Sequence, residues 1–138
     1  MIKKRLVYFF LIVFFCLGFS SASFNSTWNT SAISMFSSDA DQITLPLEDG
    51  GSYSFTVYWG DGESSFVDEW DSVNKTHTYA IEGVYNISIG GLVQGFSFGP
   101  WGVDSDKIIN ITEWGLLMFA NNGSYFRGCK KFRYSNCG

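Results

Sequence analysis

The chain has 138 residues, of which 46% are hydrophobic and 19% aromatic, and its formal net charge at pH 7 is −4. Three of the nine basic residues fall within the first five positions, so the remainder carries six basic and thirteen acidic residues, a net charge of −7. Such an acidic balance excludes nucleic acid as a partner. The length accommodates one domain with a single core, and no second long apolar run follows the N-terminus, so a later membrane span is not expected.

The N-terminus has the pattern of an export signal. Basic residues at positions 3–5 precede an apolar run from 6 to 19, and small residues follow it. This run of 14 residues is shorter than the roughly 20 that a helix needs to cross the bilayer, so we expect residues 1–23 to be a signal-peptide helix cleaved after Ala22 or Ser23. Retention as a membrane anchor is the alternative. Either way, the rest of the chain is predicted to be secreted or on the extracellular cell surface, touching the membrane only through this segment.

The remaining chain is predicted to be all-β. Residues 24–41 are rich in Ser, Thr and Asn and are expected to form an extended lead-in. Beyond them, short runs of β-branched and aromatic residues are separated by Gly-rich turn signals, including a turn expected at Gly90-Gly91. In chain order, the expected strands cover 42–47, 52–59, 65–70, 76–80, 84–90 and 107–114.

The run from 52 to 59 has the clearest strand periodicity. Large apolar residues at its odd positions alternate with mostly polar residues at its even positions, as in a strand with one buried face. Helical periodicity is not sustained anywhere after the N-terminal segment. Several short strands at roughly ten-residue spacing are typical of a β-sandwich or barrel.

Two motifs in this region occur in a fixed order: a Trp-Gly-Asp-Gly turn, then a His-Thr-Tyr and Gly-x-Tyr strand pair. The motif positions are Trp59, Gly60, Asp61, Gly62, His77, Tyr79, Gly83 and Tyr85. Together they resemble polycystic-kidney-disease-like (PKD-like) domains over about residues 42–92, which implies an immunoglobulin-like sandwich, placed here at 42–98. We expect the motif residues to be structural, with His77, the only histidine, tying one strand to the turn.

A second resemblance begins after the expected sandwich. A strand pattern ending in Glu113-Trp114-Gly115 precedes the phrase Tyr125-Phe126-Arg127-Gly128-Cys129-Lys130-Lys131-Phe132. This is similar to the point where BspA-like leucine-rich-repeat surface proteins enter their repeats, in which a Phe-x-Gly-Cys-x-x-Leu phrase recurs. Here it occurs once, so residues 99–138 are interpreted as a linker strand and a partial or degenerate repeat entry. A truncated chain, a diverged remnant and a complete short relative remain open.

Two kinds of covalent modification fit an exported chain. Six of the eight asparagines match the N-glycosylation pattern Asn-x-Ser/Thr, although a bias toward these residue types would produce the same excess. They are Asn25, Asn29, Asn74, Asn86, Asn110 and Asn122. Cys129 and Cys137 could form a disulfide; alternatively, Cys129 is a buried apolar residue.

Ligand contacts are sought among aromatic and acidic residues. The candidate aromatic contacts are Trp70, Phe96, Phe98 and Trp101. No cofactor is expected, but the pairs Asp39 with Asp41 and Asp104 with Asp106 offer oxygens suited to calcium. Neither pair has the spacing of a known calcium loop, so solvated carboxylates are the default interpretation.

Catalysis is not expected. Five carboxylates crowd residues 61–71, but they fall in and around expected surface turns, and no serine-hydrolase elbow, zinc-protease or phosphate-loop motif occurs. The predicted function is a secreted or cell-surface adhesion module that binds protein or carbohydrate, at the front of a repeat surface protein. The alternatives are a carbohydrate-binding module of a secreted hydrolase and a purely structural spacer or cap.

Overall fold

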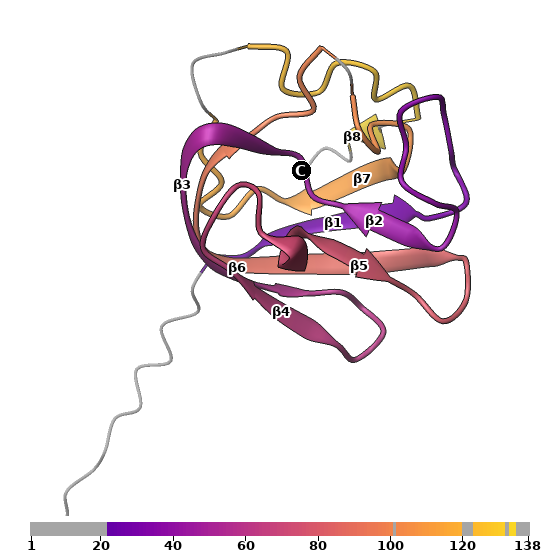
Figure 1. The fold of residues 1–138 in the computed structure, drawn as a ribbon, viewed down its shortest axis with the longest axis horizontal. Helices are drawn as coiled ribbons and strands as arrows, with labels where there is room; N and C mark the ends of the chain where they lie inside the picture. Colours follow the sequence, from indigo (N-terminus) through magenta and orange to yellow (C-terminus); the bar gives the residue numbers. More distant parts are fainter. Residues whose placement is uncertain (1–21, 101, 120–122, 132, 135–138) are drawn as a thin grey trace, which may run out of the picture.

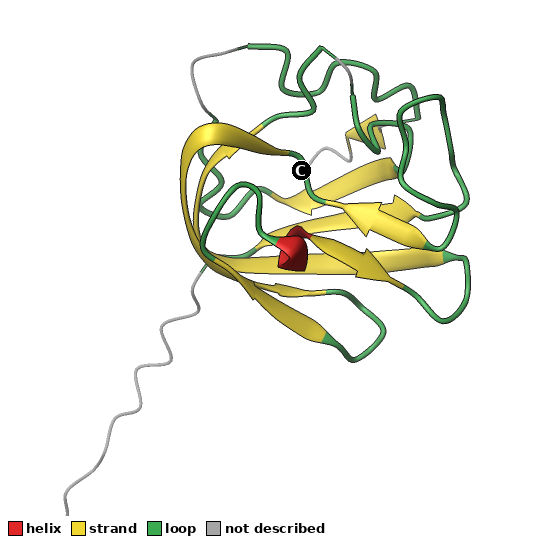
Figure 2. Ribbon diagram, viewed as in Figure 1, coloured by secondary structure: helices red, strands yellow, loops and turns green. Residues whose placement is uncertain are grey.

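The computed structural model describes residues 22–100, 102–119, 123–131 and 133–134, and in these residues the all-β prediction is confirmed (Figures 1 and 2). The expected signal-peptide helix falls almost entirely outside the described residues. Within the described part, no helix has the length and apolar character to cross a membrane. The elements are β1 Phe24–Asn29, β2 Gln42–Thr44, β3 Leu47–Tyr58, β4 Ser64–Val67, the 3-10 turn η1 Val73–Lys75, β5 Thr76–Thr78, β6 Val84–Phe96, β7 Ile108–Glu113 and β8 Arg133–Tyr134.

The strands form one large and one small sheet. The large sheet has the order β4-β3-β6-β1-β7-β8, and the small sheet pairs β2 with β5. Figure 1 shows the small sheet lying across one face of the large one, with the long loops gathered at the top of the view and β4 at the bottom. Neighbouring strands are antiparallel except β7 and β8, which are parallel.

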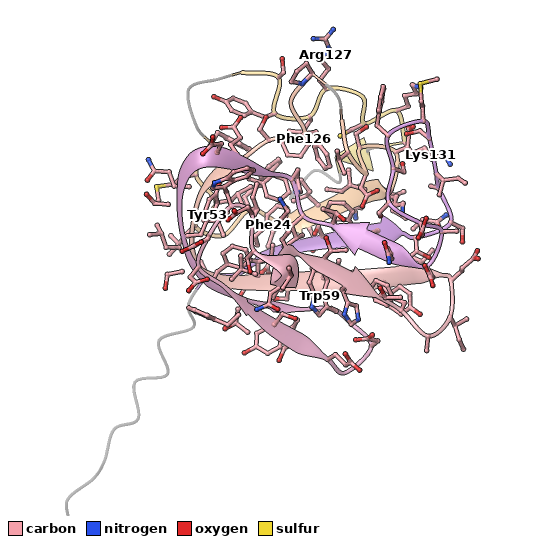
Figure 3. All side chains as sticks on the ribbon, in the orientation of Figure 1. Phe24, Tyr53, Trp59, Phe126, Arg127 and Lys131 are labelled. Carbon is pink, nitrogen blue, oxygen red and sulfur yellow. The ribbon has the colours of Figure 1, made fainter. Side chains whose placement is uncertain are left out.

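The core lies between the two sheets and under the long loops. It is strongly aromatic, because the alternating residues of β1, β3 and β6 turn their large side chains to one face. Figure 3 shows Phe24, Tyr53 and Trp59 in this interior. The largest of the fully buried apolar side chains are Phe24, Trp28, Ile43, Leu45, Phe55, Trp59, Tyr79, Ile87, Phe96, Ile108 and Ile111.

The extended lead-in predicted for 24–41 is corrected by the structure, because its first residues form β1, a strand in the middle of the large sheet. β1 pairs with β6 on one side and β7 on the other, so this sheet extends beyond both predicted sandwich boundaries, 42 and 98. The strand pattern was hidden by Ser26, a polar residue at a buried position. Its hydroxyl accepts a hydrogen bond of 2.8 Å from the indole N–H of Trp28, which makes burial of both groups favourable.

A second correction concerns Gly90-Gly91, which predicted a turn but lies inside β6. Here the glycines let two strands approach closely instead of reversing the chain. Gly91 has φ +125, and a Cβ at this position would come within 2.8 Å of the Cα of Phe55 on β3. The strand expected to end at residue 90 therefore continues to Phe96.

Candidate functional site

Residues of the Trp-Gly-Asp-Gly turn and of the His-Thr-Tyr segment meet in one cluster at the junction of the two sheets. The Nε2 atom of His77, on β5, lies 2.7 Å from Oδ2 of Asp61 in the turn after β3. The imidazole ring stacks on Trp59, with ring centroids 4.9 Å apart, and meets the ring of Tyr79 edge-on at 4.6 Å. The Tyr79 hydroxyl donates a 2.9 Å hydrogen bond to the Trp59 carbonyl, so the cluster joins the small sheet to the turn.

Glycine and hydrogen bonding fix the shape of this turn. Gly60 has φ +87, and a Cβ there would lie 2.5 Å from the carbonyl oxygen of Asn86, so no other residue fits without rearrangement. Partial burial opposes ionisation of Asp61, but hydrogen bonds from His77 and from the backbone N–H of Glu63 hold its pKa below the ordinary value. Burial raises the pKa of Tyr79 well above its ordinary value.

The remaining motif residues extend the cluster along β6. The ring of Tyr85 stacks on Tyr79 with centroids 3.9 Å apart. The backbone N–H of Gly83 donates to the hydroxyl of Thr30, which anchors the start of β6 to the end of β1. These contacts hold strands together, whereas Gly62 has open space around it and serves the turn through its φ of +99.

The five carboxylates of residues 61–71 do not share one position. Asp61 belongs to the motif cluster, whereas Glu63, Asp68, Glu69 and Asp71 are exposed on the turns before and after β4. This placement is typical of a solvated acidic face.

The predicted aromatic contacts do not form one patch. Phe96 and Phe98 are 0% and 4% exposed and pack on one another in the core, so their assignment as ligand contacts is wrong. The error came from the glycines around them, which indicate an exposed turn. Gly95 instead lies in close packing, because a Cβ there would come within 2.5 Å of the Tyr53 hydroxyl. Trp70 is 40% exposed after β4, with the Lys75 ammonium 5.4 Å from its ring centroid. Trp101 lies outside the described residues.

A buried ion pair occupies the calcium site proposed at Asp104 and Asp106. The Asp104 carboxylate accepts hydrogen bonds from the backbone N–H groups of Ser38 and Thr44 and from the Ser38 hydroxyl. The cation beside it is the Lys107 ammonium, 3.5 Å away, and both side chains are 0% exposed. The Asp104 carboxylate therefore already accepts its hydrogen bonds from groups of the protein. Among the described residues, no group of three or more His, Cys, Asp and Glu side chains is placed to hold a metal ion.

Lys107 fastens the loop after β1 to the large sheet. Its ammonium donates hydrogen bonds of 2.7–3.1 Å to the Ser38 hydroxyl and to the carbonyls of Ser38, Asp39 and Gln42. Burial lowers the pKa of Lys107, and the neighbouring Asp104 opposes that effect. This network was not predicted from the sequence, where its only local signal is an acidic and a basic residue three positions apart.

Beside this network lies a hollow of about 390 Å³, which the sequence analysis also missed. Residues from three loop segments line it: the segment 34–36, the loop before β7 (Pro100, Gly102, Ser105 and Asp106) and the segment 127–130. Its lining combines cationic, acidic, apolar and hydroxyl groups: Ser34, Met35, Phe36, Pro100, Gly102, Ser105, Asp106, Arg127, Gly128 and Lys130.

The glycosylation-pattern asparagines are spread over the described surface, with three of them on one face of the large sheet. Asn25 on β1 aligns with Ser88 on β6 and with Glu113 on β7, and its amide donates 2.6 Å to the Glu113 carboxylate. Asn86 and Asn110 both align with Thr27, on either side of β1. The three patterns thus follow from alternation of polar residues on adjacent strands.

The other predicted modification sites are dispersed. Asn29 ends β1 and Asn74 lies in η1, whereas Asn122 is outside the described residues. Cys129 has no disulfide partner in the described part of the chain, and because Cys137 lies outside it, the disulfide stays a prediction. Burial raises the pKa of the Cys129 thiol to about 12.

The chain was compared with known proteins at the levels of family, sequence and structure. No protein-family model, curated protein or solved structure matches it.

Proposed function

We propose that this chain is a secreted or cell-surface, non-catalytic module for adhesion to protein or carbohydrate, placed at the front of a repeat surface protein. The observation that carries the proposal is the parallel pairing of β7 with β8. Asn110 aligns with Arg133 and Ile111 with Tyr134, an offset of 23 residues in both pairs. Leucine-rich repeats have periods of roughly 20–29 residues and set one parallel strand per repeat beside the next.

The segment between these strands supports the same interpretation. Phe126 and Cys129 are partly buried and pack against the core. Figure 3 shows Phe126 pointing toward the interior and Arg127 away from it. Gly128 has φ +87, and a Cβ there would lie 2.7 Å from the Ser105 hydroxyl, which explains the glycine of the repeat-like phrase. The first coil of a repeat array must pack its apolar residues on the strand that precedes it, and the residues of this segment do so.

An immunoglobulin-like, PKD-like sandwich is the second part of the proposal. It is supported by a small sheet lying across a large antiparallel one and by the convergence of the Trp-Gly-Asp-Gly turn with His77 and Tyr79. In this arrangement the motif residues hold the two sheets together. A ligand would then bind at the loops or on the outer faces of the sheets.

Two experiments test the proposal. The full chain with a C-terminal epitope tag is expressed in a secretion-competent host, and the tag is detected in the medium and on intact, unpermeabilised cells. Extracellular tag on a protein whose N-terminus begins at Ser23 or Phe24 is expected, and tag confined to the cytosol would contradict export. Reading the coding sequence beyond codon 138 tests the array: Phe-x-Gly-Cys phrases spaced by about 23 residues are expected there, matching the β7–β8 offset.

A further inference from the structure

The positive charge of this acidic chain is concentrated in one place. Of the six basic residues after position 5, Lys107 is buried and bonded within the protein, and Lys75 donates to the Trp70 carbonyl. The other four occupy positions 127–133, in the repeat-like phrase and just after it. Two of these, Arg127 and Lys130, line the hollow beside the Lys107 network.

Bonds and close contacts next to the hollow tie the three loop segments to one another. The buried Asp104–Lys107 pair binds the loop after β1 to the loop before β7. The third wall fits tightly on the second: Gly102 and Gly128 both approach the Ser105 side chain so closely that a Cβ on either would lie 2.7 Å from its hydroxyl oxygen. Pockets whose walls are already ordered lose little conformational entropy when a ligand binds.

The polar groups of the hollow are available to a ligand. Arg127 and Lys130 are exposed, and neither side chain forms an ion pair with any residue in the described part of the chain. Asp106 adds a carboxylate acceptor, and Phe36, 49% exposed, adds an apolar ring surface. A single site thus offers cations for a carboxylate, an acceptor for hydroxyl groups and an aromatic surface.

We propose that this hollow binds a carboxylate-bearing sugar unit of an acidic polysaccharide. Arg127 and Lys130 would bind the sugar carboxylate through charge-assisted hydrogen bonds, Asp106 would accept from ring hydroxyls, and Phe36 would contact the apolar face of the ring. The inference rests on the proposed function, since it specifies the ligand of an extracellular binding module.

The lining favours a polysaccharide over an acidic peptide. Its walls are turns and not a free strand edge, so an extended peptide would find no ladder of backbone groups to pair with. Asp106 can accept hydrogen bonds from sugar hydroxyls, whereas the ionised side chains of an acidic peptide have no donor to offer it. The volume of about 390 Å³ is at the small end of ordinary ligand pockets.

The test measures binding of the full chain, recovered from a secretory host, to immobilised polygalacturonate, with dextran as the neutral polysaccharide. The variants Arg127→Gln and Lys130→Gln remove one lining charge each. Lys131→Gln is the matched control, because Lys131 is equally exposed and basic but does not line the hollow. Thermal unfolding of each variant checks that the fold is unchanged.

We expect polygalacturonate binding, with Kd raised about tenfold by each lining variant and less than about twofold by Lys131→Gln. Equal weakening by all three variants would mean unspecific attraction to the basic end and would overturn the inference. Absence of polygalacturonate binding, or dextran binding of the same strength, would overturn it too. These failures are distinct from failure of the proposed function, which is judged by extracellular location and by the coding sequence beyond codon 138.

Discussion

The Asp61–His77 pair and the Asp104–Lys107 pair each join separate segments of the chain, but they differ in their access to water. The first pair is 2.7 Å apart, with side chains 21% and 10% exposed. The second is 3.5 Å apart, and both its side chains are fully buried. The distance between the partners is therefore longer in the pair that is more deeply buried.

The difference shows how the chain stabilises a buried charge. The Lys107 ammonium donates to three backbone carbonyls and a hydroxyl, and it also lies beside Asp104, whose charge favours the ionised lysine. His77 instead has one carboxylate and an aromatic stack on Trp59. Removing a group from the first cluster would leave several buried polar atoms without partners, whereas water can replace the lost partner in the second.

Lys107→Met should therefore have the largest effect. The substitution keeps an apolar stem but leaves the Asp104 carboxylate and three carbonyls in a buried site without the ammonium. Loss of one partner of a buried ion pair costs about 3–5 kcal/mol, which we expect as the fall in free energy of unfolding measured in urea.

The double variant Asp104→Asn with Lys107→Met is the control. It removes the buried negative charge as well, so its loss of stability should be smaller than that of Lys107→Met alone. If Lys107→Met lowers the free energy of unfolding by less than about 1 kcal/mol, the buried pair behaves like an exposed one. The two clusters would then not differ in the proposed way.

His77→Phe should have a smaller effect. The new ring can still stack on Trp59, but the hydrogen bond to Asp61 is lost, which we expect to lower the free energy of unfolding by about 1 kcal/mol. Asp61→Asn removes the charge while keeping an oxygen and should cost no more. A loss from His77→Phe equal to that from Lys107→Met would show that the two clusters do not differ in the proposed way.

The pH dependence of stability that Asp61 contributes should be a smaller effect than that of either substitution. Folding lowers the pKa of Asp61 from its ordinary value of 3.8, so its ionised form stabilises the fold above that pH, and the stabilisation is lost as pH falls through the lower, folded value. The difference in urea midpoint between the wild-type chain and Asp61→Asn should therefore narrow below about pH 4. A difference that widened on acidification would contradict the assigned direction.

The same two clusters show what could and what could not be predicted from the sequence. The Asp61 turn was predicted because its glycines, carboxylate and aromatics are adjacent in the chain and follow turn chemistry. The Lys107 network was missed because its acceptors on residues 38–42 are mostly backbone atoms, which carry no sequence signal. β1 was missed for a related reason: buried Ser26 interrupts the apolar alternation, and only its bond to Trp28 shows why it is tolerated.

Labelling of Cys129 is the last and most local test of this comparison. Because burial raises the pKa of its thiol to about 12, little reactive thiolate forms at pH 8, and we expect iodoacetamide to modify Cys129 about a hundredfold more slowly in the reduced native chain than in urea. Peptide mapping separates it from Cys137. The phrase around Cys129 packs beside Ser105, one residue after Asp104, so Lys107→Met should speed its labelling whereas His77→Phe should not. Equal acceleration by both substitutions would mean that labelling follows global stability and does not report on the Lys107 network in particular.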